Sequence, residues 1–285
     1  MKYRLLALDL DGTLLGPDHT VSDANRRAVA RAQAAEVLVV PCTGRGWRES
    51  LEPLQGVGGL ELGVFNTGAA VVDMESGRPA DTAEIQPELV HELIDHLRGL
   101  PEAVLVFQEH TQTGHDFLVT GDGVLTENTQ RWFGMNNMLV REDRRPDLEA
   151  LRHTLRVGVV ATGGSAFEAE SVVAQRFGDR INLHCFAGVP TTSKEDAVYI
   201  LEIFAKGVDK WRGLAWIADQ RGIGHDQVAV IGDEINDLAM LEHAGLGVAM
   251  DNAVPQAAEL ADRKTLSNER DGVAHAIDRM LAGEW

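Results

Sequence analysis

The segment Leu-Leu-Ala-Leu-Asp-Leu-Asp-Gly at residues 5–12 constrains the fold more than any other part of the chain. Its four apolar residues are typical of a buried strand of a parallel sheet, and two carboxylates follow at once. Asp9 and Asp11 are two positions apart, so both start on the same side at the carboxyl end of the strand, where open α/β sheets bind ligands. Two carboxylates this close need a cation between them or a proton on one of them. The segment therefore predicts either a metal site with a carboxylate nucleophile or an acid beside a base.

Two later apolar segments end in groups that suit a phosphoryl ligand. Residues 37–41 lead to Thr43, Gly44 and Arg45, which offer a hydroxyl donor, an approachable backbone and a guanidinium. Residues 227–232 lead to Asp233, which can complete an oxygen ligand set for Mg²⁺. A carboxylate that attacks a phosphoryl group needs a divalent cation, hydrogen-bond donors and a fixed positive charge.

The fixed positive charge is assigned to Lys210, which stands just before a helical pattern. Apolar residues recur at helical spacing between 211 and 218, and Gly222 is expected to end that helix. Lys206 is the competing candidate for the same role.

These segments resemble, in order, the motifs of the haloacid dehalogenase superfamily of phosphohydrolases, and within it the Cof-type sugar- and cofactor-phosphate phosphatases. Four motifs carry the resemblance: Asp-Leu-Asp-Gly-Thr-Leu-Leu at 9–15, Thr-Gly-Arg at 43–45, Gly-Val-Asp-Lys at 207–210, and Gly-Asp-Glu-Ile-Asn-Asp at 232–237. Their order along the chain is what makes the resemblance specific.

The resemblance spans about residues 1–82 and 205–285 and leaves the middle of the chain matched only in length and position. Two positions depart from the usual pattern. Thr67 interrupts the Asn-Gly-Ala sequence that usually follows the third strand, and Asp251 stands where a glycine is usual. Both departures are expected to alter substrate contacts rather than the reacting groups.

What the resemblance implies is a two-step transfer. Asp9 would attack phosphorus, and Asp11 would protonate the leaving oxygen and then act as base for water. Magnesium would be held by Asp9, the backbone carbonyl of Asp11, and Asp233, with Asp237 supporting the site. The groups expected to hold the substrate are Leu10, Thr43, Gly44, Arg45, Lys210 and Asn236.

Strands and helices alternate at both ends of the chain, which predicts a doubly wound, Rossmann-like parallel sheet. The expected strands are 3–10, 37–42, 62–65, 228–231 and 247–250; the expected helices are 22–35, 47–54, 211–221 and 237–243. Ser22 is expected to cap its helix. The core would then consist of residues 1–82 and 205–285.

Residues 83–204 carry no catalytic motif and follow a different pattern. Helices are expected at 87–100, 146–155 and 166–177, and strands at 103–108, 116–120, 156–161, 181–186 and 199–203. This predicts an inserted α/β cap domain, and the resemblance implies a cap of the C2 type.

Composition narrows the partners. The 285 residues carry a net charge of −18, which argues against nucleic-acid and anionic-membrane binding. No apolar run approaches 20 residues, and Cys42 and Cys185 lie far apart, so a cytoplasmic chain with reduced thiols is expected. The expected partner is a small phosphorylated metabolite, and neither its identity nor the oligomeric state can be read.

The sequence favours a Mg²⁺-dependent phosphatase that forms an aspartyl-phosphate. The main alternative is a phosphomutase or phosphotransferase of the phosphomannomutase type, in which a sugar hydroxyl replaces water. A phospho-accepting regulator and a protein that only binds phosphorylated ligands are further alternatives. Sugar phosphates, pyridoxal phosphate, flavin mononucleotide and phosphoglycolate-like acids all remain open as substrates.

Overall fold

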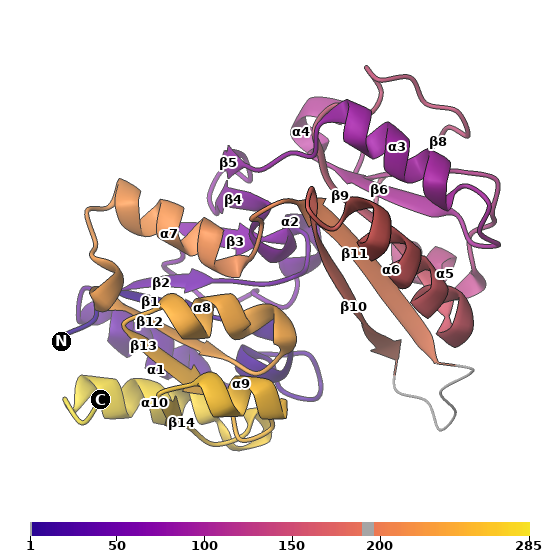
Figure 1. Cartoon of the computed structure of the whole chain (residues 1–285). Helices are drawn as coiled ribbons and strands as arrows, with labels where there is room; N and C mark the ends of the chain where they lie inside the picture. The colour runs from indigo at the N-terminus through magenta and orange to yellow at the C-terminus, as the bar shows by residue number, and fades with distance from the viewer. Residues whose placement is uncertain (1, 190–196) are drawn as a thin grey trace. The chain divides into compact units, whose positions relative to one another are not determined.

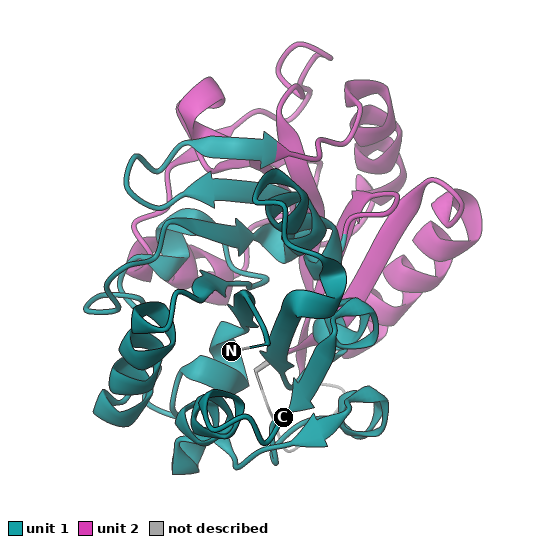
Figure 2. Ribbon diagram, turned by 90° about the vertical axis from the view of Figure 1, so that its left-hand side faces the viewer, with its two compact units in different colours: residues 1–81, 209–285 teal, residues 82–208 magenta. Residues whose placement is uncertain are grey.

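The structure is a computed structural model that describes residues 2–189 and 197–285. It divides into two compact units, coloured separately in Figure 2: unit 1 comprises residues 1–81 and 209–285, and unit 2 comprises residues 82–208. The boundary at which the chain returns from unit 2 to unit 1 lies between residues 208 and 209, whereas the sequence placed it between residues 204 and 205. The reason is that strand β11 (Val198–Ala205) runs to Ala205 and that the side chain of Asn182 donates to the Val208 carbonyl at 2.8 Å.

Unit 1 is built on a five-stranded sheet in the order β14-β13-β12-β1-β2, in which every neighbouring pair is parallel. Strand β1 lies between its two partners, with Leu5 level with both Leu38 and Val228. The strands are β1 (Leu5–Leu8), β2 (Leu38–Pro41), β12 (Val228–Gly232), β13 (Leu246–Ala249) and β14 (Arg263–Lys264).

Helices cover both faces of this sheet, because successive strand residues point to opposite sides. Leu6 and Leu8 pack in a core with α1 (Asp23–Ala34) and α10 (Gly272–Leu281). Leu5 and Ala7 pack in a second core with α7 (Lys210–Gln220) and α8 (Leu238–His243). Figure 1 shows the sheet between these helix pairs. The prediction of a doubly wound parallel sheet is therefore confirmed.

A small second sheet continues the first. It has the order β3-β4-β5 and comprises β3 (Leu62–Phe65), β4 (Ala70–Asp73) and β5 (Pro79–Thr82). Just after β2, an isolated bridge pairs Cys42 with Val64, and the Thr43 N–H donates to the Val64 carbonyl at 2.9 Å. The ends of β2 and β3 are thus fixed side by side.

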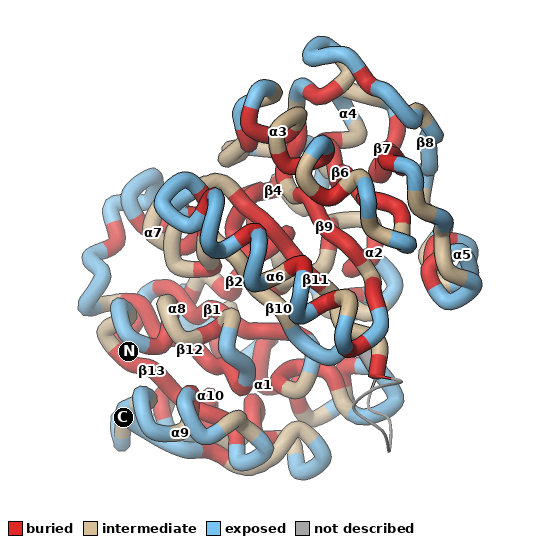
Figure 3. Tube along the Cα trace, turned by 45° about the vertical axis from the view of Figure 1, so that its right-hand side comes forward, coloured by how far each residue is buried: buried red, intermediate tan, exposed pale blue. Residues whose placement is uncertain are grey.

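Unit 2 has a six-stranded sheet in the order β10-β11-β9-β6-β7-β8, antiparallel except for β7 with β8. Helices α3 (Pro87–Leu97) and α6 (Gly163–Phe177) share one hydrophobic core with its strands. The buried strands are visible in Figure 3. The remaining strands are β6 (Val104–Gln108), β7 (Phe117–Thr120), β8 (Val140–Glu142), β9 (Thr154–Thr162) and β10 (Ile181–Val189).

One predicted helix is wrong. Residues 146 and 147 belong to no helix, residues 148–153 form turns, and β9 already begins at Thr154. Asp147 accepts from the Ala150 N–H at 2.9 Å, Gln108 donates to the carbonyls of Ala150 and Arg152, and His153 has a positive φ of 60°. Side-chain hydrogen bonds have therefore replaced the helical ones.

Several short helices have no counterpart in the prediction. They are α4 (His110–Thr113), α5 (Glu127–Met135), α9 (Pro255–Leu260) and α10, while α2 (Trp47–Ser50) is shorter than expected. Ser22 caps α1 as predicted, accepting from the Asn25 N–H. Within residues 2–189 and 197–285, no helix has the length and apolar character needed to cross a bilayer.

Unit 2 should fold without the rest of the chain, because it has a hydrophobic core of its own built from two helices and five strands. Residues 82–208 expressed alone should unfold in one cooperative transition, followed by circular dichroism and by limited proteolysis. A gradual loss of signal and uniform proteolytic cleavage would show that the unit depends on unit 1.

Candidate active site

Four segments of unit 1 bring their functional side chains together at the carboxyl edge of the parallel sheet. Asp9 directly follows β1, and Asp233 directly follows β12, its neighbour. Asp237 lies in the turn Ile235–Asp237 that precedes α8, and Lys210 is the first residue of α7. Parallel strands deliver their ends to one edge, which is why residues far apart in sequence meet there.

Lys210 is fully buried and lies between two carboxylates. Its Nζ donates to Asp9 Oδ1 at 2.6 Å and to Asp237 Oδ1 at 2.5 Å. Burial by itself would lower the pKa of Lys210, but Asp237 and Asp9 raise it above its usual value. The ammonium is therefore fixed in place and charged at neutral pH.

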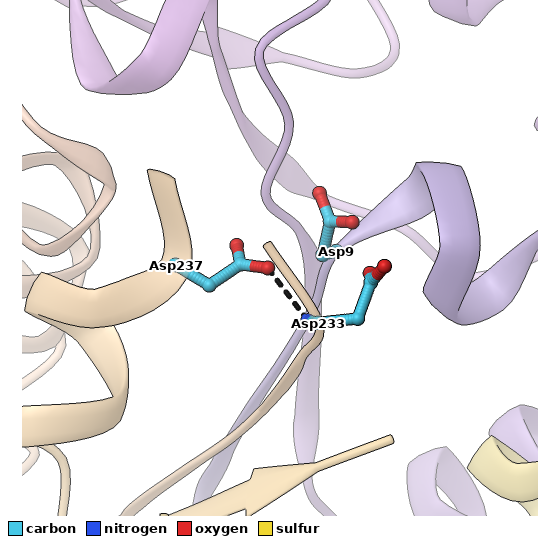
Figure 4. Close-up of side chains that lie close together, drawn as sticks. All are labelled: Asp9, Asp233 and Asp237. Atoms are coloured by element: carbon cyan, nitrogen blue, oxygen red, sulfur yellow. Dashed lines mark hydrogen bonds between the residues drawn. The ribbon is translucent and has the colours of Figure 1, made fainter. Parts of the chain in front are cut away.

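Next to this lysine, three carboxylates form an acidic cluster, and Figure 4 shows these three side chains. Ligand atoms of Asp9, Asp233 and Asp237 all lie within 4.8 Å of one another. The pKa of Asp9 is raised well above its usual value, mainly by burial. Burial is also the main reason why the pKa of Asp233 is raised to about 7. With all three ionised, one ammonium leaves the cluster with an excess of negative charge, which a bound cation would compensate.

The hydrogen bonds decide which oxygens are left for a cation. Both oxygens of Asp237 are used, since Oδ1 accepts from Lys210 and Oδ2 accepts from the N–H groups of Asp233 and Glu234. Asp233 Oδ1 accepts from the Thr13 hydroxyl at 2.6 Å. Among the described residues, no hydrogen bond is given to Asp9 Oδ2 or Asp233 Oδ2. Oxygen donors of this kind suit Mg²⁺, and Asp237 supports the other two rather than joining them.

Gly12 lets Asp233 approach the turn after β1. Its φ is +78°, and a Cβ built there would lie 2.2 Å from Asp233 Oδ2. Asn252 fixes the same turn by donating to the Gly12 carbonyl at 2.8 Å. Thr13, Gly12 and Asn252 were given no role from the sequence, although the first two follow directly on the acidic pair.

Asp11 lies outside the acidic cluster. Its carboxylate accepts from Arg45 Nε at 2.7 Å and from Arg45 Nη2 at 2.5 Å, and its side chain is 47% exposed. The pair joins the ends of β1 and β2 and occupies the guanidinium assigned to substrate. Any metal contact of Asp11 would come from its backbone carbonyl, as expected, and not from this carboxylate.

The loop after β2 places the remaining substrate groups. The Thr43 hydroxyl accepts from the Arg45 N–H at 3.1 Å and keeps its own proton to donate. A Cβ built on Gly44 would lie 3.4 Å from Asn236 Nδ2 and 3.4 Å from Thr67 Oγ1. The structure therefore brings Gly44 and Asn236 together as the sequence predicts, and it adds Thr67 beside them. Leu10 is buried in the turn after Asp9.

Gly68 lets this part of the site meet α7. A Cβ built on Gly68 would lie 1.8 Å from the carbonyl oxygen of Asp209, which is the N-cap of α7. Asp209 in turn accepts from the Arg212 N–H at 2.8 Å, so the first turn of α7 is fixed where it presents Lys210.

Lys206 is exposed in unit 2, where its Nζ donates to the Gly178 carbonyl at 3.4 Å, so the buried lysine is Lys210. Cys42 is buried next to it, with Sγ 3.9 Å from the Lys210 carbonyl oxygen. Burial raises the pKa of the Cys42 thiol well above its usual value. Nothing in the sequence pattern singled out Cys42, because it reads as one more apolar residue after a strand.

A parallel sheet with an inserted unit and an acidic cluster at its carboxyl edge is the architecture of a hydrolase. Haloacid dehalogenase-like hydrolases match residues 6–277, and the chain belongs to this family. The phosphatase YwpJ of Bacillus subtilis is 29% identical over 309 residues, which cover 98% of this chain and all of the relative. The prediction of a phosphatase-type hydrolase of this superfamily is confirmed.

Two further similarities cover nearly the whole chain. The 5-amino-6-(5-phospho-D-ribitylamino)uracil phosphatase YcsE of Bacillus subtilis is 29% identical, covering 96% of this chain and 94% of the relative. A haloacid dehalogenase-like hydrolase from Bacteroides thetaiotaomicron has a similar structure, with a TM-score of 0.77 and 27% identity, covering 98% of this chain and 99% of that one. The inserted cap domain is part of the same likeness.

Asp233→Asn should raise the Tm of the chelated protein at pH 8 by about 2–4 °C, because it removes one of three crowded buried carboxylates. At pH 5 the gain should shrink, since the pKa of about 7 leaves Asp233 protonated there. Thermal unfolding in EDTA measures both values. Asp219→Asn, at a side chain that is 72% exposed, is the control without gain. Equal gains at both pH values would contradict the crowding argument.

Proposed function

We propose that this protein is a Mg²⁺-dependent phosphatase that hydrolyses phosphate monoesters of small metabolites through an aspartyl-phosphate. The observation that carries the proposal is the buried cluster in which Lys210 bridges Asp9 and Asp237 beside Asp233. It combines a carboxylate nucleophile, a fixed cation and free carboxylate oxygens at one edge of the sheet. A phosphoryl group needs these three together.

The residues present fit a magnesium ion. Asp9 and Asp233 each leave one carboxylate oxygen without a hydrogen bond from the described residues, and the backbone carbonyl of Asp11 adds a third oxygen donor. When bound, Mg²⁺ would neutralise charge on the phosphoryl oxygens and on the attacking carboxylate. Asp237 would keep Lys210 and the turn after β12 in position.

The chemistry of the chain itself follows from the roles of Asp9 and Asp11. A carboxylate oxygen of Asp9 forms a bond to phosphorus while the bond to the ester oxygen breaks, and Asp11 gives that oxygen a proton. Asp11 then takes a proton from the water that hydrolyses the aspartyl-phosphate. Since a carboxylate held by two N–H donors of Arg45 has no proton to give, the Asp11–Arg45 pair has to open for the first step.

Four groups would hold the phosphoryl oxygens in this scheme: the Thr43 hydroxyl, the Lys210 ammonium, the Asn236 amide and the backbone N–H groups near Leu10 and Gly44. Arg45, once released from Asp11, would reach the substrate as well. Preorganised donors of this kind are worth most in a buried site, because no solvent has to reorganise during the reaction.

The substrate class is proposed from the relatives. YcsE acts on a phosphorylated ribityl compound. By analogy, we propose that the substrate of this enzyme is a phosphate ester on a polyol chain. Residues 82–208 carry none of the proposed reacting groups, so we assign recognition of the leaving portion to them as a cap of the C2 type. With both cysteines present as free thiols, we expect the enzyme to act in a reducing compartment, the cytoplasm.

Release of inorganic phosphate from a panel of phosphate monoesters in Mg²⁺ tests the function. Asp9→Asn should lower turnover to below about one thousandth, because an amide is no nucleophile toward phosphorus. EDTA should abolish activity, and added Mg²⁺ should restore it. Asp18→Asn, an exposed residue, is the matched control.

The outcomes separate the alternatives. Activity of Asp9→Asn near that of the wild type would refute the covalent mechanism, and activity in exhaustively chelated enzyme would refute the metal requirement. An isomerised phosphate ester without release of phosphate would identify a phosphomutase instead.

Lys210→Ala should lower kcat/KM by about 10²-fold or more, because the fixed positive charge next to Asp9 is lost. Lys206→Ala is the control and should change kcat/KM little, since Lys206 is exposed and its Nζ donates to the Gly178 carbonyl. Circular dichroism should show that both variants are folded. The opposite ranking of the two lysines would place the charge on the wrong residue.

A further inference from the structure

The loop after β3 holds a side chain for which the proposed chemistry has no use so far. Asn66 and Thr67 have positive φ angles of 48° and 55°, and this region is unfavourable for a β-branched residue such as threonine. The conformation is held by the chain itself, because the Asn66 N–H donates to the Arg45 carbonyl at 2.9 Å and the Thr67 N–H donates to the Thr43 carbonyl at 3.0 Å. Strain that a structure maintains in this way is a pointer to function.

The hydroxyl of Thr67 is buried without a partner. The residue is 1% exposed, and its Oγ1 has no hydrogen-bond partner among the described residues. Leaving a buried hydroxyl unpaired costs folding free energy, so a structural role would normally provide it with an acceptor. Among the residues that the structure describes, the amide oxygen of Asn236 is also buried without a hydrogen-bond partner. The Thr67 hydroxyl and the nitrogen of the Asn236 amide, Nδ2, face the same place.

That place is the space above Gly44. A Cβ at this position would lie 3.4 Å from both Thr67 Oγ1 and Asn236 Nδ2, and glycine leaves the space empty of side chain. A hydroxyl and an amide N–H can both donate. Gly44 belongs to the loop that begins with Thr43. The hydrogen bond from the Thr67 N–H to the Thr43 carbonyl holds this loop against the loop after β3.

We propose that Thr67 is a further substrate-binding residue, whose hydroxyl donates a hydrogen bond to a phosphoryl oxygen seated above Gly44 together with the amide of Asn236. The inference rests on the proposed phosphatase function and deepens it. No proton leaves Thr67 in this role; the hydroxyl only binds. The strained backbone of residues 66 and 67 is what brings the side chain beside Gly44, and the ligand supplies the acceptor that the free protein lacks.

Three variants test the role. Thr67→Val removes the hydroxyl and keeps the shape, and Thr67→Ser keeps the hydroxyl. Thr120→Val is the matched control. Thr120 at the end of β7 is also 1% exposed and its Oγ1 also has no partner within residues 2–189 and 197–285, but it belongs to unit 2. Each protein is measured by thermal unfolding, by the inhibition constant of inorganic phosphate, and by kcat/KM for p-nitrophenyl phosphate and for glycerol phosphate, all in Mg²⁺.

Thr67→Val should raise the inhibition constant of inorganic phosphate by about tenfold, the effect of one hydrogen bond to a charged group. It should lower kcat/KM for both esters by a similar factor, because the phosphoryl group is common to both. Its Tm should equal or exceed that of the wild type, since no protein hydrogen bond is lost. Thr67→Ser should stay within about threefold of the wild type, and Thr120→Val should leave all kinetic values unchanged.

Other results overturn the inference. An unchanged inhibition constant in Thr67→Val shows that the hydroxyl does not bind phosphate. A loss confined to one ester shows that it contacts the leaving portion instead. A lower Tm with unchanged phosphate affinity shows a structural hydrogen bond, for example to a buried water.

The failure of the proposed function looks different from these results. In that case the wild type itself releases no phosphate from any ester and gains no thermal stability from inorganic phosphate, and the inference falls with it. An active wild type with an equally active Thr67→Val overturns the role of Thr67 alone.

Discussion

The ammonium of Lys210, buried between Asp9 and Asp237, is the interaction on which the rest of the site depends. It joins the end of β1, the first turn of α7 and the turn before α8. Removing one member of a buried pair typically costs about 3–5 kcal/mol, because the partner is left charged and dry. The same arrangement adds little net stability over an apolar core, so its value lies in holding a nucleophile and a positive charge in fixed geometry.

Close backbone approaches make this geometry possible. Gly12 allows Asp233 to lie against the turn after β1, and Gly68 allows the loop after β3 to touch the N-cap of α7. In both places a Cβ would overlap another atom. The sheet alone would bring the strand ends to one edge; these two contacts then set which side chains meet there. The apolar strand residues thus specify the fold, whereas Gly12 and Gly68 specify the arrangement of the side chains in the site.

Much of the fold and part of the site could be predicted from the sequence. Apolar runs that end in acid or hydroxyl groups identified β1, β2 and β12, and Asp9, Asp233 and Lys210 followed from their positions beside strand ends and a helix start. The turns at 148–153 could not be predicted, because they depend on Gln108, a residue distant in sequence. The Asp11–Arg45 pair, the support from Thr13 and the unpaired hydroxyl of Thr67 also depend on tertiary contacts between strand ends, which no local pattern encodes.

The buried thiol of Cys42 beside Lys210 allows opening of the site to be followed by chemical labelling. Cys42 has no exposed surface and its Sγ lies against the Lys210 carbonyl, whereas Cys185 is partly exposed. A thiol reagent reacts with the thiolate, so it reaches Cys42 only when the β2 end and α7 separate. The labelling rate of this one atom then reports the free energy of local opening around Lys210, independently of turnover. Ligands that stabilise the closed site would slow the labelling. Cys42 is thus a built-in probe of how firmly the Lys210 ammonium is held in place.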